Sequence, residues 1–212
     1  MSKLCFAALV FLTATSTSLA QHFDIRGYGG INFVHLSTDQ GELNIDGIIH
    51  RRSIEGRPGA QYGFAVTFGD QFYVQPGLQF STISTRVINE NTSTGNELTD
   101  ETTLSLISVP LKFGFRLIPP DTENFINVRL FGGFDGHHVT SVDHSLNDPA
   151  TAEIDEDDYN NLIINADFGL GLDFWFLFID AGYQIGLTPI HASGDDATAS
   201  AFYTNLGVRI SL

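Results

Sequence analysis

The chain of 212 residues has a single cysteine, little positive charge and no long apolar run. The cysteine, Cys5, lies in the first 20 residues, so the rest of the chain has no thiol for a disulfide, a cysteine-based metal site or a cysteine nucleophile. Ten Lys and Arg residues face 25 Asp and Glu, and the resulting charge of −15 argues against nucleic acid as a partner. After residue 20, no segment stays apolar over the roughly 18 residues that a transmembrane helix needs.

The first 20 residues have the pattern of a secretory signal peptide. Lys3 supplies positive charge, and residues 4–12 (LCFAALVFL) form an apolar run that is too short to span a bilayer. The small residues Ser18 and Ala20 fit a cleavage site. We therefore expect residues 1–20 to be removed on export and residues 21–212 to form one domain.

The remainder of the chain alternates between apolar and polar residues with a period of two. In one segment, for example, Ile179, Ala181 and Tyr183 share one face, while Asp180 and Gly182 share the other. This pattern predicts an all-β fold, an eight-stranded antiparallel up-and-down transmembrane β-barrel. The expected strands cover residues 24–37, 60–69, 72–81, 103–117, 125–136, 161–175, 177–188 and 201–212.

The alternation does not by itself show which face points inward, because a soluble barrel of the lipocalin kind has an apolar interior. Two features of the connections favour the membrane. The last strand ends the chain, so it can pair with the first and leave no open edge in lipid. Short and long connections also alternate, as periplasmic turns and outer loops do. The short ones lie near 69–71, 118–124 and 175–176, and the long ones near 38–59, 82–102, 137–160 and 189–200.

A third feature is that charges of both signs lie on the polar faces of the predicted strands. The interior of an eight-stranded barrel is just wide enough for side chains to fill it, so opposite charges there can pair and offset the cost of desolvation. We predict a structural network in the lumen, with ion conduction and simple contact with water as the alternatives. Its expected members are Arg26, Lys112, Arg116, Arg129, Asp167, Asp173, Asp180 and Arg209.

Three segments carry a resemblance to a known family. Residues 103–115 (TLSLISVPLKFGF), 74–80 (VQPGLQF) and 177–190 (LFIDAGYQIGLTPI) are similar to strands of the outer-membrane β-barrel domain proteins of the PorT-like, porin-family type. The resemblance covers essentially the whole chain after residue 20. It implies a place in the bacterial outer membrane, contact with lipid and lipopolysaccharide, and handling by the barrel-assembly machinery. A few members of the family assist protein secretion.

The third long connection combines histidines with an acidic run. Carboxylates in series can bind Ca²⁺ or Mg²⁺, and His137, His138 and His144 could add a transition metal. The spacing matches no EF-hand or zinc motif, so a solvated acidic loop with weak cation binding is the preferred interpretation, and no metal or other cofactor is expected. The run contains Glu153, Asp155, Glu156, Asp157 and Asp158.

Two smaller groups allow other chemistry. One basic cluster consists of His50, Arg51, Arg52 and Arg57. It could contact lipopolysaccharide, although the simpler interpretation is that it balances the negative charge of the acidic loops. His35 is followed two residues later by Ser37, but no hydrolase motif surrounds them.

We therefore predict a non-enzymatic outer-membrane protein with a structural, adhesion or binding role through its long acidic loops. These loops could bind a protein partner, which the sequence does not identify. Two alternatives remain at this point. One is an accessory component of secretion or small-solute transport, and the other is a soluble periplasmic ligand-binding barrel.

Overall fold

The computed structural model describes residues 23–37, 42–45, 48–91, 97–118, 125–146, 162–189 and 198–212. These residues form nine strands in one antiparallel sheet. None of them belongs to a helix long and apolar enough to cross a membrane. The strands are β1 (Phe23–Ser37), β2 (Glu42–Ile45), β3 (Ile48–Phe68), β4 (Phe72–Asn91), β5 (Glu97–Arg116), β6 (Ile126–Leu146), β7 (Ile163–Phe174), β8 (Leu177–Gly186) and β9 (Thr198–Ser211).

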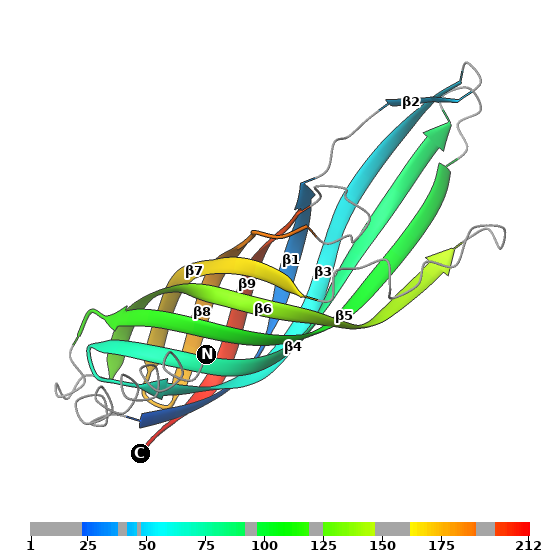
Figure 1. The fold of residues 1–212 in the computed structure, drawn as a ribbon. Coiled ribbons are helices and arrows are strands. Elements are labelled where there is room, and N and C mark those ends of the chain that lie inside the picture. Colours follow the sequence, from blue (N-terminus) through cyan, green and yellow to red (C-terminus); the bar gives the residue numbers. More distant parts are fainter. Residues whose placement is uncertain are drawn as a thin grey trace, which may run out of the picture.

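Eight of these strands close into the predicted up-and-down barrel (Figure 1). Closure is made by β1, which pairs with β9 on one side and with β3 on the other. The remaining barrel strands pair in sequence order, so every strand is antiparallel to its neighbours. The ninth strand, β2, was not predicted. Within the described part of the chain, it pairs with the outer end of β3 alone, from Glu42↔Arg51 to Ile45↔Ile48.

Tight turns lie at one end of the barrel. Residues 69–71 join β3 to β4, and Trp175 and Phe176 join β7 to β8. Gly69 has a φ of 113°, a left-handed conformation that glycine adopts without a steric penalty. The C-terminus lies at this end, opposite β2 (Figure 1). Outer-membrane barrels keep their short turns on the periplasmic side, and we therefore call this end of the barrel the periplasmic end.

Four strands are longer than the sequence predicted, so the predicted loops 38–59 and 82–102 are largely wrong. At the outer end, β3 begins at Ile48, β4 continues to Asn91, β5 begins at Glu97 and β6 continues to Leu146. Beyond the membrane a strand has water on both sides, so it needs no alternation of apolar residues. Pairing that continues from the barrel determines the structure there, rather than the local sequence.

The barrel is inverted relative to a soluble protein. Among the described residues, 20 buried residues are polar or charged and only 11 are hydrophobic. Arg26 is 0% exposed, whereas the side chains of Leu170 and Phe168 are more than half exposed. Exposed apolar surface on this scale requires lipid around it. The distribution excludes the soluble ligand-binding barrel.

Aromatic side chains gather around the periplasmic end. Phe72 packs against Phe115 with ring centroids 4.9 Å apart, and Trp175 against Phe176 at 4.7 Å. Phe125 nearby is also largely exposed. Aromatic girdles of this kind flank the apolar band of outer-membrane barrels at the membrane–water interface.

Candidate functional site

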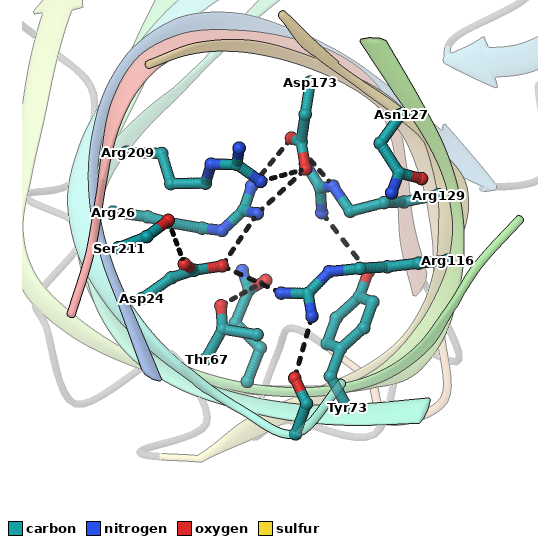
Figure 2. A network of polar contacts seen from close by, with 12 residues as sticks. Asp24, Arg26, Thr67, Tyr73, Arg116, Asn127, Arg129, Asp173, Arg209 and Ser211 are labelled. Carbon is teal, nitrogen blue, oxygen red and sulfur yellow. Dashed lines mark hydrogen bonds and ion pairs between the residues drawn. The ribbon is translucent and has the colours of Figure 1, made fainter. Parts of the chain in front are cut away.

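The lumen near the periplasmic end holds a network centred on Asp173, which we call the basal network (Figure 2). Arg26 donates two hydrogen bonds to the Asp173 carboxylate, both 3.1 Å long. Arg129 donates to the same carboxylate through Nε at 2.9 Å, and Arg209 through a terminal nitrogen at 3.0 Å. One carboxylate on β7 therefore ties together strands β1, β6 and β9.

Asp24 is the second anionic centre of the basal network. Its carboxylate lies 2.8 Å from Arg116 and 3.5 Å from Arg26, and it accepts a 2.6 Å hydrogen bond from Ser211. Arg116 also donates to the backbone carbonyl of Gly69 at 2.8 Å. The contacts link the β3–β4 turn to the line where β1 and β9 close the barrel.

A separate set of contacts lies farther from the periplasmic end, and we call it the central cluster. The Lys112 ammonium lies 2.8 Å from the Asp167 carboxylate and donates to the Tyr203 hydroxyl at 2.8 Å. Tyr203 in turn donates to Asp167 at 3.0 Å. Between this cluster and the basal network, Arg129 forms a 2.6 Å ion pair with Asp180.

Among the described residues, four aromatic side chains are buried in the lumen, and each faces a glycine on the neighbouring strand. The pairs are Tyr73↔Gly114, Phe131↔Gly169, Phe178↔Gly207 and Tyr203↔Gly182. A Cβ atom on any of these glycines would collide with the ring opposite it. The glycines therefore provide the space in which the rings lie flat against the barrel wall. The rings also make cation–π contacts: Lys112 lies 4.7 Å from the centroid of Phe131.

Replacing Gly182 by alanine is expected to lower the free energy of unfolding by about 1–3 kcal/mol, as overpacking does. The added Cβ would lie 2.5 Å from Cζ of Tyr203, whose hydroxyl holds Lys112 and Asp167. Urea unfolding in lipid vesicles, followed by the fluorescence of the single tryptophan, Trp175, measures the change.

The matched control for this substitution is Gly27→Ala on β1. A Cβ at Gly27 would have no atom within 4 Å, so the variant should be as stable as the wild type or slightly more stable. Equal destabilisation by both substitutions would show that packing against the Tyr203 ring does not determine the cost.

The structure places all eight of the predicted lumen residues inside the barrel and brings them into contact in the basal network, in the central cluster and in the ion pair between the two. Sequence reasoning missed Asp24, Asp135 and Tyr203, which are also buried in the lumen. The sequence contained a signal for the two carboxylates, because residues an even number apart in a strand share a face. Asp24 lies two residues before Arg26, and Asp135 lies six residues after Arg129.

The histidine group that was considered for metal binding is not assembled. His137 faces the lumen, where its Nδ1 lies 2.6 Å from the Ser108 hydroxyl, whereas His138 is exposed on the opposite face of β6. No group of three or more potential metal ligands occurs among the described residues. The His144 side chain and the acidic run 153–158 lie outside the part of the chain that is described, as do residues 1–22 with the predicted signal peptide.

Arg57 belongs to an ion-pair group on the strand extensions. Its guanidinium lies 2.8 Å from Glu101, which also lies 3.6 Å from Arg86. All three side chains are about a third exposed. Of the other basic or catalytic candidates, His35 is exposed, and the side chains of His50, Arg51, Arg52 and Ser37 are not among those described.

Comparisons with known proteins agree with this architecture. A family model described as "Outer membrane protein beta-barrel domain" matches residues 18–192. The fold is similar to that of the outer membrane protein OprG from Pseudomonas aeruginosa, at 14% identity and a TM-score of 0.52, over 91% of this chain and 97% of that one. Ail, the attachment invasion locus protein of Yersinia pestis, aligns at 16% identity and a TM-score of 0.45, over 91% of this chain and 100% of that one. None of the curated proteins matches the sequence.

Proposed function

The chain belongs to the outer membrane protein β-barrel domain family, and on that premise we propose that it is a non-enzymatic binding protein of the bacterial outer membrane. Its working surface is the sheet that projects beyond the membrane, rather than the lumen. The observation that carries this proposal is the length of four strands.

Strands β3 to β6 are 20 or 21 residues long, about twice the 9–11 residues that cross a membrane. On β4 the outward-facing apolar residues run from Phe72 to Phe80, and Thr82 begins the polar part. The strands on the other side are shorter, since β7 has 12 residues and β8 has 10. The barrel thus carries a one-sided extension, with β2 at its far end (Figure 1).

Among the described residues, the extension has an edge on β6 to which no further strand is added. Pairing between β6 and β7 ends at His137↔Ile163, and from there to Leu146 β6 pairs only with β5 among the described residues. An edge strand of this kind offers unpaired N–H and C=O groups to an extended segment of another protein. The binding mode that we propose is the addition of a strand at this edge.

Charge indicates what kind of segment would bind. Residues 38–59, 82–102 and 138–158 contain four, four and seven carboxylates. The basic residues in these segments are Arg51, Arg52, Arg57 and Arg86. A basic extended segment therefore complements the surface, and its association should weaken as salt increases.

Shortening the β4–β5 hairpin tests the proposal. Ile83 and Leu104 are register partners, so residues 84–103 can be replaced by Asn-Gly, which forms a two-residue hairpin turn. The shortened barrel should keep its heat-modifiable migration on gels. Phage-displayed dodecapeptides selected against the wild type in nanodiscs should be basic and extended, and the shortened barrel should retain them at least tenfold less well.

The control variant for the selection is Asp70→Asn in the periplasmic β3–β4 turn, at the opposite end of the barrel. It removes one carboxylate and should bind the selected peptides as the wild type does. Equal retention of the peptides by the shortened barrel would contradict the proposal.

We also propose that the lumen is structural and that the protein does not conduct ions. The basal network crosses the lumen between strands far apart in sequence, as in the contact of Arg26 with Asp173. Planar-bilayer recordings of the folded protein should show no stepwise conductance above background. Reproducible steps that disappear in a lumen variant such as Asp167→Asn would instead support the transport alternative.

A further inference from the structure

The lumen becomes apolar at its outer end. Buried residues there form one cluster, and partly buried residues pack against it. Together they are Val34, Leu104, Ile163, Ala199 and Ala201, with Ile83, Val139 and Val142. We call these residues the apolar layer. Most of the other side chains that are buried in the lumen are polar or charged, so an apolar layer at this level needs a reason of its own.

The apolar layer extends across the lumen rather than along one side of it. Val34 lies on β1, Leu104 on β5 and Ile163 on β7, and no two of these strands pair with each other. Because the three residues belong to one cluster, their side chains and those between them meet across the interior. Further members come from β4, β6 and β9, so the layer closes the lumen from most of its circumference.

Buried amide side chains lie directly beneath the apolar layer. Asn32 precedes Val34 by two residues on β1, and therefore shares its inner face one step closer to the periplasmic end. Asn165 follows Ile163 by two residues on β7 and is related to it in the same way. Asn32 donates a hydrogen bond to Gln61. Going inward, the lumen thus passes from the apolar layer to the amides, the central cluster and the basal network.

The space at the boundary between the apolar layer and the amides is too small for a hydrated ion. A cavity of about 30 Å³ is lined by Val34, Leu104 and Ile163 together with Asn32 and Asn165. It has room for about two water molecules. An ion in the layer would lose its hydration shell among side chains that cannot replace it, which is the reason that hydrophobic constrictions exclude ions.

We propose that the apolar layer is the outer permeability barrier of the barrel, which keeps ions outside the polar lumen. The basal network closes the opposite end by ion pairs, and the apolar layer closes the outer end by excluding water. This role rests on the proposed absence of conduction and assigns the outer closure to particular residues. Access of an ion to the lumen and conduction through the barrel are measured separately, so the two proposals can fail separately.

An ion that passes the apolar layer can be detected with a thiol placed beneath it. Ser108 is 1% exposed and follows Leu104 by four residues on β5, on the same face and closer to the periplasmic end. Cys5 is the single cysteine of the chain, so Ser108→Cys in a Cys5→Ser background carries one thiol. The folded protein in nanodiscs is exposed to Ag⁺, a cation that binds thiols, in nitrate buffer. Maleimide labelling after unfolding, followed by mass spectrometry, counts the thiol that has not reacted.

The thiol of Ser108→Cys should react with Ag⁺ at least tenfold more slowly than the thiol of Thr140→Cys, which is exposed on β6. A polar side chain in the layer should admit water and ions. Leu104→Asn and Val34→Asn, each combined with Ser108→Cys, should therefore accelerate its reaction at least tenfold. The two variants change different strands, so the test does not depend on the folding of either one. Asp143→Asn, on the exposed part of β6, should leave the reaction slow.

The barrier role would be overturned if Ser108→Cys reacted as fast as Thr140→Cys. It would also be overturned if neither Leu104→Asn nor Val34→Asn accelerated the reaction in barrels that keep their heat-modifiable migration. Fast reaction without conductance in planar bilayers would leave the basal network as the element that prevents conduction. Stepwise conductance of the wild type would instead contradict the proposed absence of conduction itself.

Discussion

Replacing Asp173 by alanine should lower the free energy of unfolding by about 3–5 kcal/mol, because removing one partner of a buried ion pair leaves the other charge uncompensated. Asp173 is 1% exposed and is shared by Arg26, Arg129 and Arg209. Arg129 keeps Asp180 and Arg26 keeps Asp24, so the loss stays within the range for a single broken pair. Urea unfolding in lipid vesicles, with Trp175 fluorescence as the signal, measures the difference.

The control for this prediction is Glu101→Ala on the strand extension. Glu101 also holds two arginines, Arg57 and Arg86, but the three side chains are about a third exposed to water. Exposed pairs contribute about 0–1 kcal/mol, so this variant should unfold almost as the wild type does. If both substitutions had the same small effect, the basal network would not be the element that stabilises the lumen.

The interior of the barrel was predictable because lipid fixes which face of every strand is apolar. Once Ile25 is assigned to lipid, Arg26 must point inward, and the same parity applies to Asp167, Asp173 and Asp180. The partners were not predictable. Arg26 meets Asp173, 147 residues away, and this contact depends on the register and tilt of strands that the local sequence does not specify.

The outer extension was not predicted because neither face of its strands meets lipid. Residues 82–91 and 97–102 are rich in Ser, Thr, Asn and Glu, a composition that is read as loop when no apolar face is present. Their pairing follows from the barrel beneath them: once Phe80 is opposite Ile107, the ladder continues through Ser84↔Thr103 to Glu90↔Glu97. Periodicity indicates burial rather than hydrogen bonding, so it detects the strand only where one face meets lipid.

The strongest test of the membrane assignment is a charge on the lipid face. Leu170 lies near the middle of the apolar band of β7, and its side chain is 57% exposed. In a soluble protein, arginine at such an exposed position would cost little. In a barrel that lipid surrounds, Leu170→Arg should lower the free energy of unfolding by about 2–4 kcal/mol, because the guanidinium lies at the bilayer midplane.

Leu162 provides the matched control at the outer end of the same face. It is 60% exposed, similar to Leu170, but it precedes the first residue of β7 and so lies near the headgroup level. Leu162→Arg should cost about 0–1 kcal/mol, because an arginine there can extend into water and toward lipid phosphates. We therefore expect the loss of unfolding free energy to depend on depth in the membrane, although the two positions are similarly exposed. Equal and small costs in vesicles would contradict the membrane orientation of the barrel, whereas equal and large costs would place Leu162 within the hydrocarbon region.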